Sequence, residues 1–324
     1  MCNRSSMNVS GLIDADRVLG LVDELYGLGT QEVFFHGFGE PACHPRLADM
    51  ILHCRAHYPR LRLHLITNGA WSSRALDDAV IEGRVHTRFS IHAGEEATWR
   101  QIHPRDNVEC FLQTGENLRR LAAFAPARVE VLYVICNLNF HKIPDMVSYA
   151  CEHGVKRILF RPMRLFQDRT GRYMNASLQL SAEQYRQAAA TIARLARQFR
   201  GRIRLHSIPF EQNSFHQELG RPSSRAFYLS RSCYIGYVLA VIERDGGVWG
   251  CLPESSSGEP LGNIFETSFR EIWYGDKYAR FRKTQLFLDK AGLDHTGCHS
   301  YCQHLDTNLR LNRLNPWRNF KRLF

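Results

Sequence analysis

Between residues 12 and 160 the chain alternates short apolar runs with amphipathic segments, and this alternation limits the folds open to it. The apolar runs predict strands at 32–36, 61–66, 85–91, 128–136 and 156–160. The amphipathic segments predict helices at 45–57, 73–81, 108–124 and 141–153, and a helix capped by Asp14 before the first strand. Strands that alternate with helices pair as βαβ units. The sequence therefore predicts an α/β fold built on a parallel sheet.

Glycine and polar residues follow four of the predicted strands. They occupy positions 37–41 (GFGEP), 67–69 (TNG), 90–92 (SIH) and 161–162 (RP). Ligands of parallel α/β sheets bind at the carboxyl ends of the strands. These four segments are therefore the candidate binding site.

The last third of the chain has a different organisation. A long helix is expected at 181–200, and a hairpin is expected at 237–250, with its turn at 244–247. Four cysteines with the spacing C-x17-C-x46-C-x3-C lie around and beyond this hairpin: Cys233, Cys251, Cys298 and Cys302. Four converging thiolates suit either zinc or an iron–sulfur cluster, although the usual C-x2-C zinc knuckle is absent.

Composition narrows the class of protein. Hydrophobic residues make up 44% of the 324 residues, which favours a packed core over disorder. No apolar run is long enough for a membrane span, and the first residues are too polar for a secretory signal. The net charge is +10, from 42 Lys+Arg less 32 Asp+Glu, but the basic residues are spread along the chain. A solvated basic surface is therefore favoured over a nucleic-acid site.

The ten cysteines favour metal ligands and reduced thiols over disulfides, which belong to small secreted domains. Cys54 and Cys151 fall within predicted helices, and Cys136 ends a predicted strand. These three are expected to be core thiols.

Taken together, these motifs resemble the radical S-adenosylmethionine (SAM) enzymes that carry a C-terminal SPASM or twitch extension. In that superfamily a C-x3-C-x2-C loop binds a 4Fe–4S cluster, and Cys2 resembles its third cysteine. The resemblance implies a partial (β/α)6 TIM-like barrel that lacks its first strand and the first two cluster cysteines. The expected cause of this absence is a translation start assigned at an internal methionine, with a split or decayed gene as the alternative.

The resemblance also implies a SAM site at the strand ends. The GFGEP turn corresponds to the family's segment that meets the SAM amino group, and the later segments approach the ribose and carboxylate. The implied SAM-binding residues are Gly37, Gly39, Glu40, Pro41, Asn68, Ser90, His92, Asn139 and Arg161. His92 stands where the family usually has an acid. No residue is assigned as the catalytic hydrogen donor.

The C-terminal part resembles the extension from Cys233 through 245–251, 261–264 and 269–273. With four cysteines, the resemblance implies one auxiliary 4Fe–4S cluster on Cys233, Cys251, Cys298 and Cys302, as in the twitch form. The expected domains are 1–205 for the barrel, 206–307 for the auxiliary cluster domain and 308–324 for a basic tail.

The implied function is a cytoplasmic radical SAM oxidoreductase or epimerase. It would cleave SAM to a 5′-deoxyadenosyl radical and take hydrogen from a small-molecule or sugar-derived substrate. Its cofactors would be SAM and the two 4Fe–4S clusters, and its electron donor a flavodoxin or ferredoxin. Three alternatives stay open: a peptide-modifying radical SAM maturase, an inactive cluster- or zinc-binding protein, and an RNA-modifying or RNA-binding protein.

Overall fold

The computed structural model describes residues 11–37, 39–104, 107–163, 175–207, 228, 231–251, 259–286, 302 and 304–314. The chain divides into two compact units. The first is Gly29–Ile208 together with the N-terminal ten residues, and the second combines Gly11–Leu28 with Pro209–Phe324.

The first unit is built on a six-stranded parallel sheet whose strands pair in sequence order. The strands are β1 (Glu32–Phe35), β2 (Arg62–Thr67), β3 (His86–Ser90), β4 (Val129–Ile135), β5 (Arg157–Pro162) and β6 (Arg204–Ser207). The predicted α/β fold with a parallel sheet is confirmed. Only β6 was not predicted, because its four residues include a single apolar side chain, Leu205.

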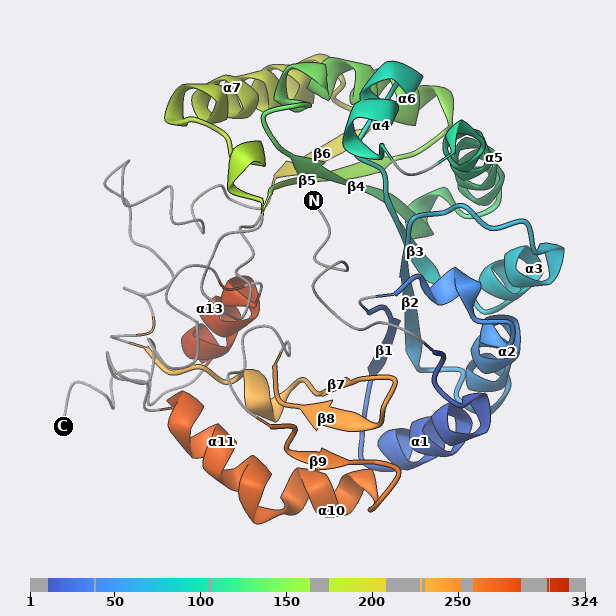
Figure 1. Cartoon of the computed structure of the whole chain (residues 1–324), viewed down its shortest axis with the longest axis vertical. Helices are drawn as coiled ribbons and strands as arrows, with labels where there is room; N and C mark the ends of the chain where they lie inside the picture. Colours follow the sequence, from blue (N-terminus) through green and yellow to red (C-terminus); the bar gives the residue numbers. More distant parts are fainter. Residues whose placement is uncertain are drawn as a thin grey trace. The chain divides into compact units, whose positions relative to one another are not determined.

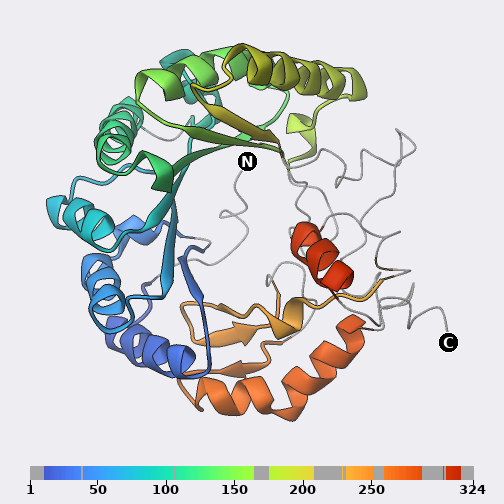
Figure 2. The ribbon, with the colours of Figure 1, turned by 180° about the vertical axis from the view of Figure 1, so that it is seen from behind.

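Helices cover one face of this sheet, as Figure 1 shows and Figure 2 repeats from behind. They are α2 (Leu47–His57), α3 (Arg74–Glu82), α4 (Glu96–Ile102), α5 (Val108–Phe124), α6 (Ile143–Glu152) and α7 (Ala182–Gln198). Alternate residues of each central strand are fully buried; in β4 these are Val129, Val131, Tyr133 and Ile135. The period of two places these side chains on one face and leaves Glu130 and Val134 on the other. The sequence thus gives the sheet one apolar face and one partly polar face.

Local signals set the helix boundaries. Ser181 and Gln184 form a reciprocal capping box at the start of α7. Ser73 caps α3 by accepting from the main-chain N–H of Leu76 at 3.2 Å. Each cap satisfies a main-chain donor that the first helical turn leaves unpaired.

The second unit contains a three-stranded antiparallel sheet and four helices among its described residues. The strands are β7 (Val241–Ile242), β8 (Gly247–Trp249) and β9 (Gly262–Asn263); the helices are α1 (Ala15–Gly27), α10 (Phe269–Tyr274), α11 (Asp276–Leu286) and α13 (Leu305–Leu314). The predicted hairpin corresponds to β7 and β8, joined by a turn in which Gly246 has φ +82°. A small apolar core of Val248, Phe269, Ile272 and Tyr278 holds the sheet to α10 and α11.

Helix α1 belongs to this second unit. Its residues Leu21 and Leu25 pack on the core around Val248. Its Glu24 carboxylate accepts hydrogen bonds from the main-chain N–H groups of Phe269 at 3.1 Å and Arg270 at 2.7 Å, at the start of α10. A carboxylate is favoured there because a helix N-terminus carries partial positive charge. The predicted domain limits, which put residues 15–27 with the barrel, stay predictions.

Within the described part of the chain, no helix combines the length and the apolar character that crossing a membrane requires.

Candidate functional site

The turn after β1 is fixed by the Glu40 carboxylate. One oxygen accepts hydrogen bonds from the Ala42 N–H at 3.0 Å and the Thr67 hydroxyl at 2.6 Å, and the other accepts from the Asn68 N–H at 2.7 Å. Thr67 and Asn68 lie at the carboxyl end of β2. Glu40 therefore clamps two neighbouring strand ends together, and its oxygens already have partners inside the protein.

The segment after β2 is held equally firmly. The Gly69 N–H donates to the Thr67 hydroxyl at 2.9 Å, and Gly69 has φ +84°. A Cβ at this glycine would lie 2.5 Å from Cδ1 of Phe89, so only glycine fits. The turn therefore depends on Gly69 for both its backbone conformation and its packing.

Two polar residues of α5 fasten this turn from the helix side. The Thr114 hydroxyl donates to the Asn68 carbonyl at 3.1 Å, and Asn117 Nδ2 donates to the Gly69 carbonyl at 2.8 Å. Both residues are fully buried. Neither residue was predicted from the sequence, although polar residues among the apolar positions Phe111, Leu118 and Leu121 were a signal that could have indicated them.

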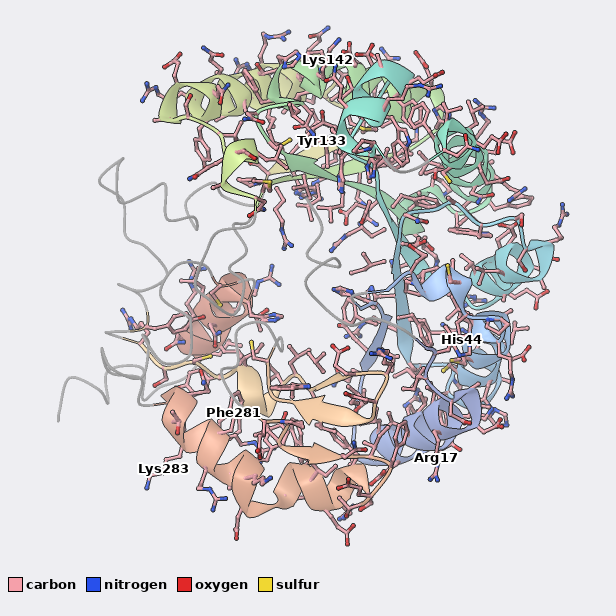
Figure 3. The ribbon with its side chains drawn as sticks, viewed as in Figure 1. Arg17, His44, Tyr133, Lys142, Phe281 and Lys283 are labelled. Carbon is pink, nitrogen blue, oxygen red and sulfur yellow. The ribbon has the colours of Figure 1, made fainter. Side chains whose placement is uncertain are left out.

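Asn139 joins the ends of β3 and β4. It is fully buried, and its Oδ1 accepts from the Cys136 N–H at 2.7 Å. Its Nδ2 donates to the carbonyls of His92 at 3.0 Å and Val134 at 2.9 Å. The hydroxyl of Tyr133, which is labelled in Figure 3, donates to the Asn139 carbonyl at 2.9 Å. Both side-chain donors of Asn139 are used inside the fold, so the observed geometry gives it a structural role and the predicted SAM contact gains no support.

His92 acts as a neutral acceptor in the same region. Its Nδ1 accepts from the Val134 N–H at 3.2 Å, and its ring stacks on His103 with centroids 5.9 Å apart. Desolvation, with a further contribution from His103, lowers the pKa of His92 to about 3. The ring therefore stays uncharged at neutral pH and cannot replace the negative charge of the family's usual acid.

Arg161 lies on the sheet face opposite the helix-covered one, at the register position of Val134. Its Nε is buried and has no hydrogen-bond partner among the described residues. Desolvation lowers the pKa of His36, at the end of β1, and the charges of Arg161 and Arg88 lower it further. Arg88 is paired with Glu130, Nη2 to Oε2 at 2.7 Å. Arg161 is thus a cation with an unsatisfied buried donor, which suits an anionic group of a ligand.

Three of the four predicted cluster cysteines come together in the second unit. Cys233 is buried beside Tyr228 and Ile235, and the partly buried Cys251 and Cys302 pack against the same group. Cys298, like Cys2, lies outside the described residues. Within the described chain there is no group of three or more His, Cys, Asp or Glu side chains arranged to hold a metal ion. The donor set nevertheless fits an iron–sulfur cluster, because the three described cysteines offer soft thiols in an apolar setting.

Helix α13 fixes the main chain around Cys233. Asn308 Oδ1 accepts from the Tyr234 N–H at 2.7 Å, and Asn312 Nδ2 donates to the Ser232 carbonyl at 2.8 Å. Residues 308–324 were predicted as a basic tail, and this contact with the residues that flank Cys233 was not predicted. Two asparagines spaced four apart among leucines were the available signal.

The remaining cysteines largely follow expectation. Cys54 and Cys136 are buried cysteines, and burial raises the pKa of Cys136. Cys151 is a free thiol that is only partly buried.

Two family models match the chain. The model of the radical SAM superfamily matches residues 1–150, and the model of the SPASM iron–sulfur cluster-binding domain matches residues 233–304. The second match contains all four predicted auxiliary ligands. Together the two domains imply SAM and 4Fe–4S clusters as cofactors.

Individual relatives agree with these matches. The PqqA peptide cyclase of Xanthomonas campestris pv. campestris (strain 8004) is 26% identical over 299 residues, covering 88% of this chain and 73% of that protein. The GTP 3',8-cyclase of Chlorobaculum tepidum is 28% identical over 169 residues, covering 51% of this chain and 50% of that protein. The chain therefore spans only half the length of this second relative.

The solved structure of Streptococcus suis SuiB aligns with a TM-score of 0.63 at 14% identity, over 89% of this chain and 65% of that one. At this identity the structural match concerns the fold alone. The fold and the two family matches lead to one assignment: the chain belongs to the radical SAM superfamily and carries a SPASM iron–sulfur cluster-binding domain.

Proposed function

We propose that this chain is the radical SAM and SPASM portion of an enzyme that modifies a peptide. The observation that carries the proposal is the match to the PqqA peptide cyclase, because it extends through both domains and covers 88% of the chain. SuiB, whose structure bound to the precursor peptide SuiA aligns with a TM-score of 0.64, has the same fold. The fold of a peptide-binding relative is compatible with the proposal.

The small-molecule or sugar-derived substrate is less well supported than this alternative. The GTP 3',8-cyclase match covers 51% of the chain, whereas the peptide-cyclase match covers 88%. An inactive cluster- or zinc-binding protein and an RNA-binding protein have no comparable relative among these matches.

The SAM site is proposed at the carboxyl ends of β1 to β5. Because both Glu40 oxygens have partners inside the protein, the main-chain carbonyls of Gly37 and Gly39 are the better acceptors for the SAM ammonium group. Both glycines are exposed, with no heavy atom within 4 Å of a Cβ position. Pro41 begins the short 3-10 helix that Glu40 caps, and thereby shapes the turn.

The remaining predicted SAM residues divide by role. Asn68, Ser90 and Arg161 are proposed to contact SAM or the substrate, and His92 and Asn139 are proposed to hold the strand ends in position. When bound, SAM with its 4Fe–4S cluster supplies a 5′-deoxyadenosyl radical for hydrogen abstraction. Cys2 is the proposed ligand of that cluster; Cys233, Cys251, Cys298 and Cys302 are proposed to hold the auxiliary one.

The substrate class is tested by deleting the gene in its source organism and comparing peptides and metabolites by mass spectrometry. The proposal expects a peptide of unchanged sequence whose mass returns to the unmodified value in the deletion strain. Unchanged peptides together with a changed small metabolite would favour the small-molecule function instead.

The cluster assignment is tested by measuring iron in anaerobically reconstituted protein. Cys233→Ala is expected to lose about four irons per chain, the content of one 4Fe–4S centre. Cys54→Ala, which removes a buried thiol of the first unit, is the matched control and should keep them. Equal iron in the two variants would contradict the assignment.

A further inference from the structure

A short chain of hydrogen bonds connects two of the proposed cluster ligands. Asn308 Nδ2 lies 3.5 Å from the Cys233 sulfur and 2.9 Å from the Tyr228 hydroxyl oxygen. The Tyr228 hydroxyl oxygen lies 3.0 Å from the Cys302 sulfur. The path therefore runs from one cysteine to another through an amide and a phenol.

The direction of these hydrogen bonds follows from their chemistry. The amide nitrogen of Asn308 can only donate, so the Tyr228 oxygen accepts from it. The same hydroxyl keeps its own proton, which is directed to the Cys302 sulfur. A cysteine that ligates iron is a thiolate and can only accept, so the Tyr228 contact becomes a donation to ligand sulfur. The second hydrogen of Asn308 Nδ2 lies between the Cys233 sulfur at 3.5 Å and the His304 carbonyl at 3.3 Å, and the negative charge of a ligand thiolate favours the sulfur.

The two donors, Tyr228 and Asn308, are shielded from water and held in place by the fold. Tyr228 is 1% exposed and Asn308 is fully buried. The Asn308 side chain is anchored through its Oδ1, which accepts from the Tyr234 N–H at 2.7 Å. Hydrogen bonds in such a low-dielectric setting are strong, and the donors cannot turn away to solvent.

We propose that Tyr228 and Asn308 donate hydrogen bonds to the thiolate ligands Cys302 and Cys233 of the auxiliary cluster and thereby raise its reduction potential. The inference rests on the proposed role of these cysteines as cluster ligands. Donors directed at the sulfurs stabilise the additional negative charge of the reduced cluster, which is the way such bonds tune the potential. Tyr228 and Asn308 are positioning residues in this scheme and do not contact the substrate.

The test is an EPR-monitored redox titration of anaerobically reconstituted protein with dithionite, which gives one electron to the cluster without any change in its bonds. Cys2→Ala is the background for all variants, so that only the auxiliary cluster contributes a signal. Tyr228→Phe keeps the ring and removes the donor. The expected result is unchanged iron and a midpoint potential lower by the equivalent of a tenfold change in the reduced-to-oxidised ratio, about 59 mV for one electron.

Tyr149→Phe is the control, because it removes a buried hydroxyl that has no hydrogen-bond partner among the described residues and lies on α6 of the first unit. Its potential should equal that of the background. Unchanged iron and an unchanged potential in Tyr228→Phe would overturn the inference while leaving the cluster assignment intact. Loss of iron in Cys233→Ala separately tests the assignment.

Asn308→Ser keeps the test decisive if Tyr228→Phe fails to fold or to hold iron. This variant removes the amide donor and leaves the Tyr228 hydroxyl in place. A lower potential with retained iron supports the inference, and a potential equal to the background overturns it.

Discussion

Glu40 and Asn68 are joined by a hydrogen bond in which the main-chain N–H of Asn68 donates to a carboxylate oxygen of Glu40 at 2.7 Å. The same carboxylate accepts from the Thr67 hydroxyl at 2.6 Å through its other oxygen. This contact couples the turn after β1 to the turn after β2. The geometry of the proposed SAM site therefore depends on a residue whose side chain faces the protein.

Glu40→Gln is expected to lower the free energy of unfolding by about 1–3 kcal/mol, because an amide NH₂ would face the Asn68 N–H and leave a donor unpaired. The dissociation constant of SAM should rise in the same variant, since the turn loses its clamp. Urea unfolding and equilibrium dialysis with SAM measure the two effects. Glu183→Gln on the exposed surface of α7 is the control and should change neither. If Glu40→Gln destabilises the protein but leaves SAM affinity unchanged, the Glu40 hydrogen bonds stabilise the fold and do not shape the SAM site.

Gly69→Ala tests whether the second turn requires glycine for space as well as for backbone conformation. Gly69 and Gly201 both have φ +84°. A Cβ added at Gly69 would lie 2.5 Å from Phe89, whereas a Cβ added at Gly201 would meet no atom within 4 Å. Gly201→Ala should cost about 1–2 kcal/mol of unfolding free energy from its left-handed backbone alone. Gly69→Ala should cost about 1–3 kcal/mol more, from overpacking against Phe89. Equal losses in the two variants, measured by urea unfolding, would show that the Phe89 contact relaxes.

His92 should make the protein less stable in acid. The pKa of His92 is lowered from 6.5 to about 3 in the folded state. Between these two values the unfolded chain binds a proton at His92 and the folded chain does not. The contribution of His92 to the free energy of unfolding is therefore fully present above pH 6.5 and is lost as the pH falls towards 3. Between pH 7 and pH 5 this loss amounts to about 2 kcal/mol.

In His92→Asn, the decrease in unfolding free energy from pH 7 to pH 5 should be smaller than in the wild type by about 2 kcal/mol. Asparagine can still accept from the Val134 N–H but does not titrate. Urea titrations at the two pH values measure the slope, and His57→Asn on the exposed part of α2 is the control. Parallel pH profiles for wild type and His92→Asn would contradict the predicted proton linkage.

Substitutions of Arg161 and Arg88 are expected to affect different properties: ligand affinity for Arg161 and the free energy of unfolding for Arg88. Arg161→Met removes a guanidinium whose buried Nε has no partner among the described residues, so the unfolding free energy should stay nearly the same. The affinity for SAM or for the substrate should fall. Arg88→Met instead leaves Glu130, whose side chain is only 17% exposed, without its partner and should cost about 1–3 kcal/mol.

Urea unfolding and equilibrium dialysis with SAM distinguish these two arginines. A fall in SAM affinity assigns Arg161 to SAM. An unchanged SAM affinity with a raised KM for the proposed peptide substrate assigns Arg161 to substrate binding. A destabilised Arg161→Met protein with both binding constants unchanged would contradict a ligand-binding role.

The sequence alone determined the fold class and the main sites of interest. Apolar runs with a period of two, separated by amphipathic helices, can bury their side chains only as a helix-covered parallel sheet, and five of the six strands followed from that pattern. The strand ends drew attention to residues 37–41 and 67–69 because ligands of such sheets bind there. The spacing of the cysteines was enough to indicate the four thiols that lie within the SPASM match.

The tertiary structure decided what each polar group is engaged with. Glu40 reaches Asn68, Asn139 reaches His92, and Glu24 reaches Arg270, and none of these pairs is close in sequence. A hydrogen bond needs atoms at about 3 Å, and periodicity gives no information on such distances between remote segments. For the same reason, only the structure distinguished Arg161, whose buried Nε has no partner among the described residues, from Asn139, whose side-chain donors are both used. It also placed Asn308 and Tyr228 beside the cysteines.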